Sequence, residues 1–264
     1  MARVSQSAQR SFAPLPEHRR SAIRQKLNGK LFLKGGPKIS DICQGAVGDC
    51  FVLAGLAALA HTRPRVIKKH ITADCHGDVH VRMARGIQIV PPREMFVDRK
   101  THEPLYAYPV GGATWVVLME NAMAMQAGGF AVLDKGGRPG DAVETLTGFK
   151  SVRRKVSSDA DFARMVDALL KEIPCTAETW PEASRVDGTC FRLDHAYTVL
   201  GAGQSIALDP SSGYVDVLDP FGSCDDRPQT HPGSAFGLSE HGHHRVPWND
   251  FKKYFLAYTT NRPV

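Results

Sequence analysis

The feature that most constrains the fold is a short segment in which two glycine-containing turns lead directly into an apolar helix. Gly45 and Gly48 precede Cys50, and the run Phe51–Ala60 is apolar nearly all round a helix. Such a helix is stable only when a larger domain buries it. Asp49 stands where its N-cap is expected. The chain must therefore build a core around this helix, with Cys50 at its amino-terminal end.

The position of Cys50 favours a reactive thiol. Free N–H groups and a partial positive charge at a helix N-terminus lower the pKa of a thiol and favour the thiolate, which is the nucleophilic form. Gln44 lies six residues earlier, and its amide can join the backbone N–H of Cys50 in an oxyanion hole. A cysteine after a glycine turn is otherwise an ordinary buried residue, so this interpretation needs a base.

His195 supplies the best candidate for that base among eleven histidines. It begins a run that predicts a core strand, and a cysteine nucleophile needs a histidine held by a third group. The run Tyr214–Leu218 predicts a second strand that ends at Asp219, which can hold the imidazole tautomer. Asp209 is a rival for the same orienting role.

The order of the remaining patterns indicates an α+β protein with a boundary near residue 150. Helices are predicted first and strands second. The predicted helices are Cys50–Ala60, Trp115–Ala127, Pro139–Leu146 and Asp161–Leu170, and the predicted strands are Val79–Met83, Ile87–Val90, Ala196–Leu200, Ser205–Leu208 and Tyr214–Leu218. The charged run Lys150–Lys155 is expected to be a connector.

The net charge of +6 belongs to the amino-terminal segment. Residues 1–40 carry nine Lys or Arg and one Glu, which leaves −2 for the rest. We interpret residues 1–30 as a disordered tail, with one short helix over 16–28, or as a signal for delivery or for an organelle. No Sec-type signal or membrane span is evident, so we expect a cytoplasmic protein or one delivered to a target cell by a non-Sec system, as a secreted effector. The six cysteines are expected to be reduced thiols.

Several segments, taken in order, resemble the catalytic core of the calpains, which are papain-like cysteine proteases. The calpain pattern Gln-Gly-x-x-Gly-Asp-Cys-Trp is similar to residues 44–51, and the helix that starts at Trp115 and Leu146-Thr147-Gly148 also match. Gly-His-Ala-Tyr-Ser-Val is similar to residues 194–199, Arg-Asn-Pro-Trp-Gly to residues 218–222, and Asp-Phe-x-x-x-Phe to residues 250–255. The resemblance covers roughly residues 31–260.

The resemblance implies a papain-like fold of two lobes. A helical lobe, residues 31–150, would carry Cys50 as nucleophile and Gln44 as oxyanion donor. A β-sheet lobe, residues 151–264, would carry His195 as general base and acid and Asp219 in the position of the family's orienting Asn. The implied activity is that of a monomeric endopeptidase that hydrolyses protein or peptide substrates through an acyl-thioester.

Four departures from the calpain pattern bear on this expectation. Asp219 replaces Asn, and Cys-His-Asp triads also serve deamidases and transglutaminases, so acyl transfer to a target protein is the alternative activity. A non-catalytic peptide-binding module on the same fold is a second alternative. Phe51 and Phe221 replace tryptophans, with Phe221 expected to shield the His–Asp contact. Asp194 replaces Gly and, with Gly48, is expected at the substrate cleft.

No cofactor is required by this chemistry, and calcium is the one metal that the resemblance raises. Asp41 and Glu120 match acids that help to hold Ca²⁺ in calpains, and oxygen ligands suit that ion. However, Ile39 replaces a basic residue, and structural roles for both acids are favoured. The histidines at 241, 243 and 244 are close enough for zinc but lack evident partners, so we expect a polar loop there. Nucleic acid is not an expected partner.

Overall fold

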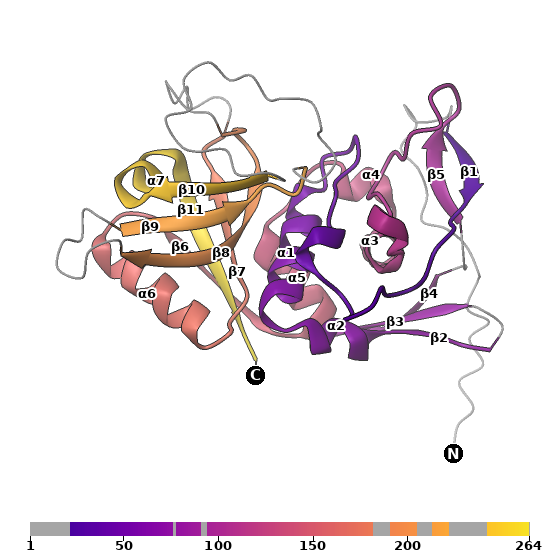
Figure 1. Cartoon of the computed structure of the whole chain (residues 1–264), viewed down its shortest axis with the longest axis horizontal. Helices are drawn as coiled ribbons and strands as arrows, with labels where there is room; N and C mark the ends of the chain where they lie inside the picture. Colours follow the sequence, from indigo (N-terminus) through magenta and orange to yellow (C-terminus); the bar gives the residue numbers. More distant parts are fainter. Residues whose placement is uncertain are drawn as a thin grey trace.

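The computed structural model describes residues 22–75, 78–90, 94–181, 191–204, 213–221 and 242–263. These residues fold into helices and antiparallel sheets, which agrees with the predicted α+β class. Figure 1 shows one large sheet with two helices at one end of the molecule, and the other helices with two small sheets at the opposite end.

The first part of the described chain is mainly helical. Its helices are α1 (Cys50–Thr62), α2 (Pro64–His70), α3 (Trp115–Ala127), α4 (Phe130–Leu133) and α5 (Pro139–Thr147). Its strands are β2 (Ile71–Ala73), β3 (Val79–Met83) and β4 (Gly86–Val90) in one antiparallel sheet, and β1 (Ala22–Lys26) paired with β5 (Glu94–Asp98). The predicted bounds of α3 are confirmed, because Gly128 ends it with a left-handed φ of 98°.

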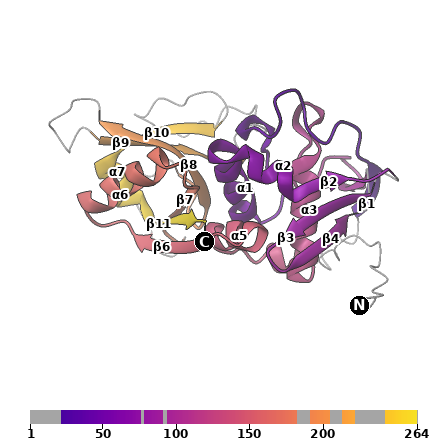
Figure 2. The same cartoon turned by 90° about the horizontal axis from the view of Figure 1, so that it is seen from below.

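The second part is built on a six-stranded antiparallel sheet. In spatial order its strands are β10 (His243–Pro247), β9 (Gly213–Leu218), β8 (Ala196–Gln204), β7 (Cys175–Thr179), β11 (Phe255–Arg262) and β6 (Lys150–Lys155). Helices α6 (Asp159–Leu170) and α7 (Trp248–Tyr254) lie beside it (Figure 2). Aromatic rings from both helices meet there, since Phe162 lies 5.2 Å and Phe251 5.7 Å from Trp248 between ring centres.

Buried apolar side chains form two clusters. The first contains α1, α3 and α5 side chains and ends at Leu146, apart from Ala196 and Leu218. The second runs from Val156 to Tyr258. The two clusters thus divide the sequence near residue 150.

Helix α1 lies where the two clusters meet, next to β8 in both views (Figures 1 and 2). Thr198 in β8 donates a 2.8 Å hydrogen bond to the carbonyl of Ala54 in α1. The ring of His61 bonds to the carbonyl of Leu200 at 2.7 Å, and Asn261 in β11 donates to the carbonyl of Gly140 at 2.8 Å. The first two bonds fix α1, and therefore Cys50, against the sheet, and the third fixes α5.

The end of the predicted tail is ordered, which corrects the expectation for residues 22–30. Residues 22–26 form β1 rather than part of a helix, because they pair in register with β5. Leu27 is buried in the first apolar cluster, and Lys30 forms an isolated parallel β-bridge with Ala113. This partner strand lies about 70 residues away in the sequence, so no local pattern announces it. Residues 1–21 lie outside the described residues.

The charged run Lys150–Lys155 is also corrected, from a connector to the edge strand β6. It pairs with β11 along its whole length. Arg153 forms an ion pair with Glu178 of β7 at 2.9 Å. Lys and Arg side chains on an edge strand oppose pairing with another chain, which accounts for a strand that lacks apolar alternation.

Two further findings concern the cysteines and the membrane question. Cys43 is disulfide-bonded, so the expectation of reduced thiols is wrong at this position, whereas Cys50, Cys75 and Cys175 are free. The described residues do not include the partner of Cys43. Within the same residues, no single helix has the length and hydropathy of a membrane span; α1 and α2 reach them only as a pair bent by 115°.

Candidate active site

Cys50 and His195, which are 145 positions apart, line one cleft of about 560 Å³. Cys50 is half-buried at the first position of α1. His195 directly precedes β8, and Asp219 directly follows β9, the neighbouring strand. The junction of α1 with β8 therefore brings the predicted nucleophile to the predicted base.

His195 is held on its backbone and at one end of its ring. The hydroxyl and backbone of Thr179, at the end of β7, hydrogen-bond the backbone of His195. Its Nε2 lies 3.0 Å from Oδ1 of Asp219, and Cys50 is close enough to act on the pKa of the same ring. Burial alone would lower the pKa of His195, but the bonds to Asp219 and Cys50, with their charges, outweigh it and raise the pKa to about 9.

Asp219 is the partner that orients this ring. Burial would raise its pKa, but hydrogen bonding and charge from His195, the backbone N–H of Phe221 and the charge of Arg192 hold the pKa of Asp219 below its ordinary value. Because an ionised carboxylate only accepts hydrogen bonds, the ring nitrogen donates to it. The arrangement keeps the other ring nitrogen for the thiol.

An aromatic ring covers this contact. The ring of Phe221 stacks on His195 at 5.5 Å between centres and 19° between planes. The guanidinium carbon of Arg192 lies over Phe221, 4.7 Å from the ring centre. The Nε of the same arginine is 3.6 Å from Oδ2 of Asp219. The sequence patterns did not predict a role for Arg192. The one sequence feature that could have suggested it is its position three residues before His195.

The chain matches the family model described as calpain family cysteine protease over residues 6–227. It belongs to the calpain family. Membership in the papain-like superfamily fits the same match.

Curated relatives are calpains of low identity. Calpain-13 of Rattus norvegicus is 28% identical over 230 residues, which cover 80% of this chain and 33% of that protein. Calpain-9 of Mus musculus and the calpain-2 catalytic subunit of Bos taurus are each 26% identical, over 213 and 211 residues, which cover 72% of this chain and 29% of each relative. The chain thus spans about a third of the length of the relatives it matches.

The other residues expected at the cleft line it as well. Gln44 is buried beside Cys50; its side-chain amide donates to the carbonyl of Val47 at 2.7 Å, and its backbone N–H donates to the carbonyl of Pro220 at 2.9 Å. Gly48 donates its backbone N–H to Asp134, and a Cβ at this position would lie 2.8 Å from the carbonyl oxygen of Asp134. The site therefore needs glycine at position 48.

Asp194 lies in the cleft with a positive φ of 50°. Glycine adopts this conformation without strain, and Asp is among the few other residues that tolerate it. The backbone geometry is thus the one that the Gly of the calpain pattern would favour. The backbone N–H of Asp194 donates to the carbonyl of Trp180 at 2.8 Å.

A pair of buried acids lies behind Cys50, which the sequence did not predict. Asp49 occupies the N-cap position of α1, but its side chain makes no capping bond and instead faces Glu120 of α3. Burial raises the pKa of Asp49 to about 6, and burial together with the charge of Asp49 raises the pKa of Glu120 well above its ordinary value. Because each buried carboxyl disfavours the ionisation of the other, both pKa values are raised.

The residues expected for calcium do not form a calcium site as they stand. Oδ2 of Asp41 accepts from the indole of Trp115 at 2.7 Å and from the backbone N–H of Lys38 at 2.9 Å. Both oxygens of Glu120 accept from the backbone N–H of Ala107. Calcium takes six to eight oxygen ligands, and the described residues contain no group of three His, Cys, Asp or Glu able to hold a metal. Calcium dependence remains a prediction, and no step below uses it.

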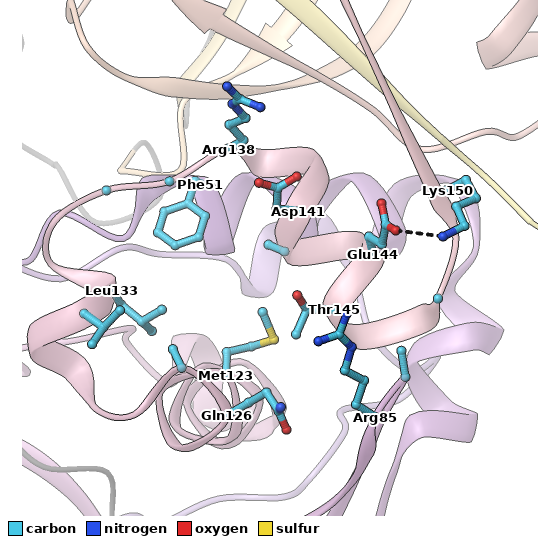
Figure 3. A pocket seen from close by; sticks show the side chains of 17 residues that line it. Phe51, Arg85, Met123, Gln126, Leu133, Arg138, Asp141, Glu144, Thr145 and Lys150 are labelled. Atoms are coloured by element: carbon cyan, nitrogen blue, oxygen red, sulfur yellow. Dashed lines mark hydrogen bonds and ion pairs between the residues drawn. The ribbon is translucent and has the colours of Figure 1, made fainter.

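A second cavity of about 730 Å³ adjoins the cleft (Figure 3). Gly136 and Gly137 line both cavities, and Phe51 lies directly under Gly137, where a Cβ would come within 2.7 Å of its ring. The side chains that line the second cavity are apolar near Phe51 and Met123 and charged along α5. The two cavities are thus separated at this point by glycine backbone.

Two earlier expectations fall partly or wholly outside the described residues. Asp209, the rival of Asp219, and His241 lie outside them. His243 and His244 belong to β10 rather than to a polar loop, because they pair with Leu218 and Val217 of β9. Burial lowers the pKa of His244, whose ring contacts that of Phe191.

Proposed function

We propose that the chain is a calpain-like cysteine endopeptidase with two lobes of the papain-like type. The helical lobe, residues 31–150, carries Cys50 and Gln44, and the sheet lobe, residues 151–264, carries His195 and Asp219. One observation carries the proposal: buried His195 hydrogen-bonds Asp219 and lines the same cleft as Cys50. Nucleophile, base and orienting acid are the parts that acyl transfer requires.

The reaction begins with a proton already on His195. With a pKa of about 9, its ring is an imidazolium at neutral pH and stabilises the Cys50 thiolate. The thiolate sulfur attacks the peptide carbonyl carbon and forms a C–S bond. As the tetrahedral intermediate collapses, the C–N bond breaks and His195 gives its proton to the leaving amine.

Water completes the turnover. His195, now neutral, takes a proton from a water molecule whose oxygen attacks the thioester carbonyl. The C–S bond breaks, the acid product leaves, and the thiolate–imidazolium pair is restored. Asp219 stays ionised throughout and holds the ring in one tautomer.

Gln44 and the amino-terminal end of α1 stabilise the negative oxygen of both intermediates. The backbone N–H of Cys50 lies at the start of the helix, where the helix dipole favours negative charge. The amide of Gln44 has two N–H donors, one of which bonds to Val47; we assign the other to the oxyanion. Removal of one such donor lowers kcat by about 10²–10³-fold.

Cleavage of a denatured protein substrate by the purified chain tests the proposal. Cys50→Ala should abolish cleavage, whereas Cys75→Ala, at an exposed free cysteine outside the cleft, should leave it unchanged. Equal cleavage by wild type and Cys50→Ala would refute the proposal.

Acyl transfer without chain cleavage is the second candidate, and Asp219 is the observation that favours it, because Cys-His-Asp triads also serve deamidases and transglutaminases. Intact-mass measurement of the target separates the two. Both reactions release ammonia from a glutamine and leave the chain whole. Deamidation adds about 1 Da, whereas transamidation adds the mass of the acceptor amine less that of the ammonia released. If iodoacetamide fails to alkylate Cys50 near neutral pH, a non-catalytic peptide-binding module becomes the better interpretation.

A further inference from the structure

We propose that Arg192 is a positioning residue, which holds Asp219 and Phe221 against His195 and so fits the site to a carboxylate where the calpain pattern has Asn. This inference rests on the proposed function. It concerns a residue outside the predicted catalytic set, and it is carried by contacts that join Arg192 to two partners of His195 at once.

The ring of Phe221 contacts both His195 and Arg192. It is nearly parallel to the imidazole of His195, at 5.5 Å between ring centres. The guanidinium carbon of Arg192 lies 4.7 Å from the centre of the same ring. A guanidinium over an aromatic face attracts the ring. Arg192 therefore helps to hold in place the ring that stacks on the histidine.

The two carboxylate oxygens of Asp219 have different partners, and the guanidinium of Arg192 faces one of them. Oδ1 accepts from His195 at 3.0 Å and from the backbone N–H of Phe221 at 2.9 Å. Oδ2 faces Nε of Arg192 at 3.6 Å. Because each oxygen has its own partner, rotation of the carboxylate away from His195 is opposed from both sides.

The charge of Asp219 is balanced by nearby cationic groups. Asp219 is buried and adds a full negative charge that an Asn would not carry. His195, Arg192 and His244 face it. Burial lowers the pKa of His244, so that ring is neutral at neutral pH. Among the described groups that act on Asp219, the positive charge thus comes from His195 and Arg192. Arg192 balances the carboxylate and limits how strongly it stabilises the imidazolium.

The sheet offers a matched control in Arg245. This arginine also pairs with an aspartate, Asp216, at 2.8 Å and 2.9 Å, and also lies over an aromatic ring, Tyr214, at 4.0 Å. The pair joins β10 to β9, as does the contact of Asp219 with Gly242, but it has no contact with His195. If Arg192 were purely structural, its substitution should affect the His195 ring no more than substitution of Arg245 does.

The first measurement follows the His195 ring by NMR in a Cys50→Ala background, so it needs no substrate. Loss of a nearby cation favours the imidazolium, so Arg192→Met should raise the titration midpoint of His195 by roughly half to one pH unit. Arg192→Lys, which keeps the charge, should restore it. Arg245→Met should leave it unchanged. An unchanged midpoint in Arg192→Met would overturn the charge argument, whatever the substrate proves to be.

The second measurement is kcat and KM for cleavage. Arg192→Met should lower kcat about tenfold with little change in KM, because the ring is mispositioned while the cleft is intact. Arg192→Lys should recover only part of kcat, since an ammonium does not reproduce the planar stack. In an Asp219→Asn background, Arg192→Met should cost less than about threefold. An equal loss in both backgrounds would show that Arg192 does not act through Asp219. No cleavage by any variant, with the NMR shift present, would count against the proposed function alone.

Discussion

Two buried aspartates flank the candidate cleft, and their pKa values are shifted in opposite directions. Asp49, behind Cys50, is 0% exposed, and Asp219, beside His195, is 6% exposed. Burial pushes both pKa values upward. The carboxyl that faces Asp49 is Glu120, whereas Asp219 faces His195 and Arg192, and only the second pKa falls below its ordinary value. The partner, rather than the depth of burial, decides the direction of the pKa shift.

This difference suits the chemistry proposed for each side. Two ionised carboxylates behind Cys50 would oppose the thiolate more strongly than one. The raised pKa values of Asp49 and Glu120 disfavour the ionisation of both. His195 must instead carry a proton, and an ionised Asp219 favours it. Each variant below removes or weakens one side of this contrast.

The largest effect is expected from Asp219→Ala. It removes the acceptor that fixes His195 and leaves Arg192 without this partner, so kcat should fall about 10³–10⁴-fold. Asp219→Asn keeps an acceptor and should lose far less. Asp216→Asn, in β9 just before Asp219, serves as the control in a kcat measurement at pH 7. Similar losses for Ala and Asn would mean that charge, not orientation, is what Asp219 supplies.

On the other side of the cleft, Asp49→Asn should change stability with pH. Because the pKa of Asp49 is raised in the folded state, its contribution to stability is present below pH ~4 and is lost as pH rises through about 6. Relative to wild type, the variant should therefore gain on the order of 1–3 kcal/mol in the free energy of unfolding at pH 8 compared with pH 5.

Urea unfolding at the two pH values measures this gain. Asp141→Asn, at an exposed acid in the first turn of α5, should show no such difference. The same gain in Asp49→Asn at pH 5 and pH 8 would argue that Asp49 stays ionised in the folded protein.

The pH dependence of kcat/KM tests the contribution of His195 and Asp219. Since the pKa of His195 is about 9, the alkaline limb of kcat/KM should lie near pH 9. Its contribution to stability is likewise present below pH ~6.5 and lost through about 9. Asp219→Asn should move the limb downward by about one pH unit, because it removes a charge that stabilises the imidazolium. A limb that stays in place would assign it to another group.

The smallest effect is expected at the aromatic cover. Phe221→Leu keeps an apolar side chain but loses the stack, so kcat should fall about three- to tenfold with little change in the unfolding midpoint. Phe221→Trp should retain at least half of kcat. Kinetics at pH 7 decides, and a loss in Leu as large as that in Asp219→Ala would make Phe221 essential rather than protective.

The sequence located the residues that meet at the cleft, because their local patterns are strong. The all-apolar helix after Cys50 and the strand patterns around His195 and Asp219 are short-range signals. What it missed depends on distance or on unusual composition. β1 pairs with a strand about 70 positions away, β6 is an edge strand of charged residues, and Asp49 meets Glu120 across 71 positions. The disulfide of Cys43 is equally invisible to local patterns.

The thin glycine boundary between the two cavities has a consequence for chemical probes. A reagent with an electrophile for Cys50 would lie next to a second compartment of about 730 Å³, whose lining shares Gly136 and Gly137 with the cleft. Arg138 and Asp141 stand at the rim of that compartment and Met123 lines its interior (Figure 3). An inhibitor arm that combines an apolar body with a polar end can therefore gain selectivity from side chains that take no part in the reaction.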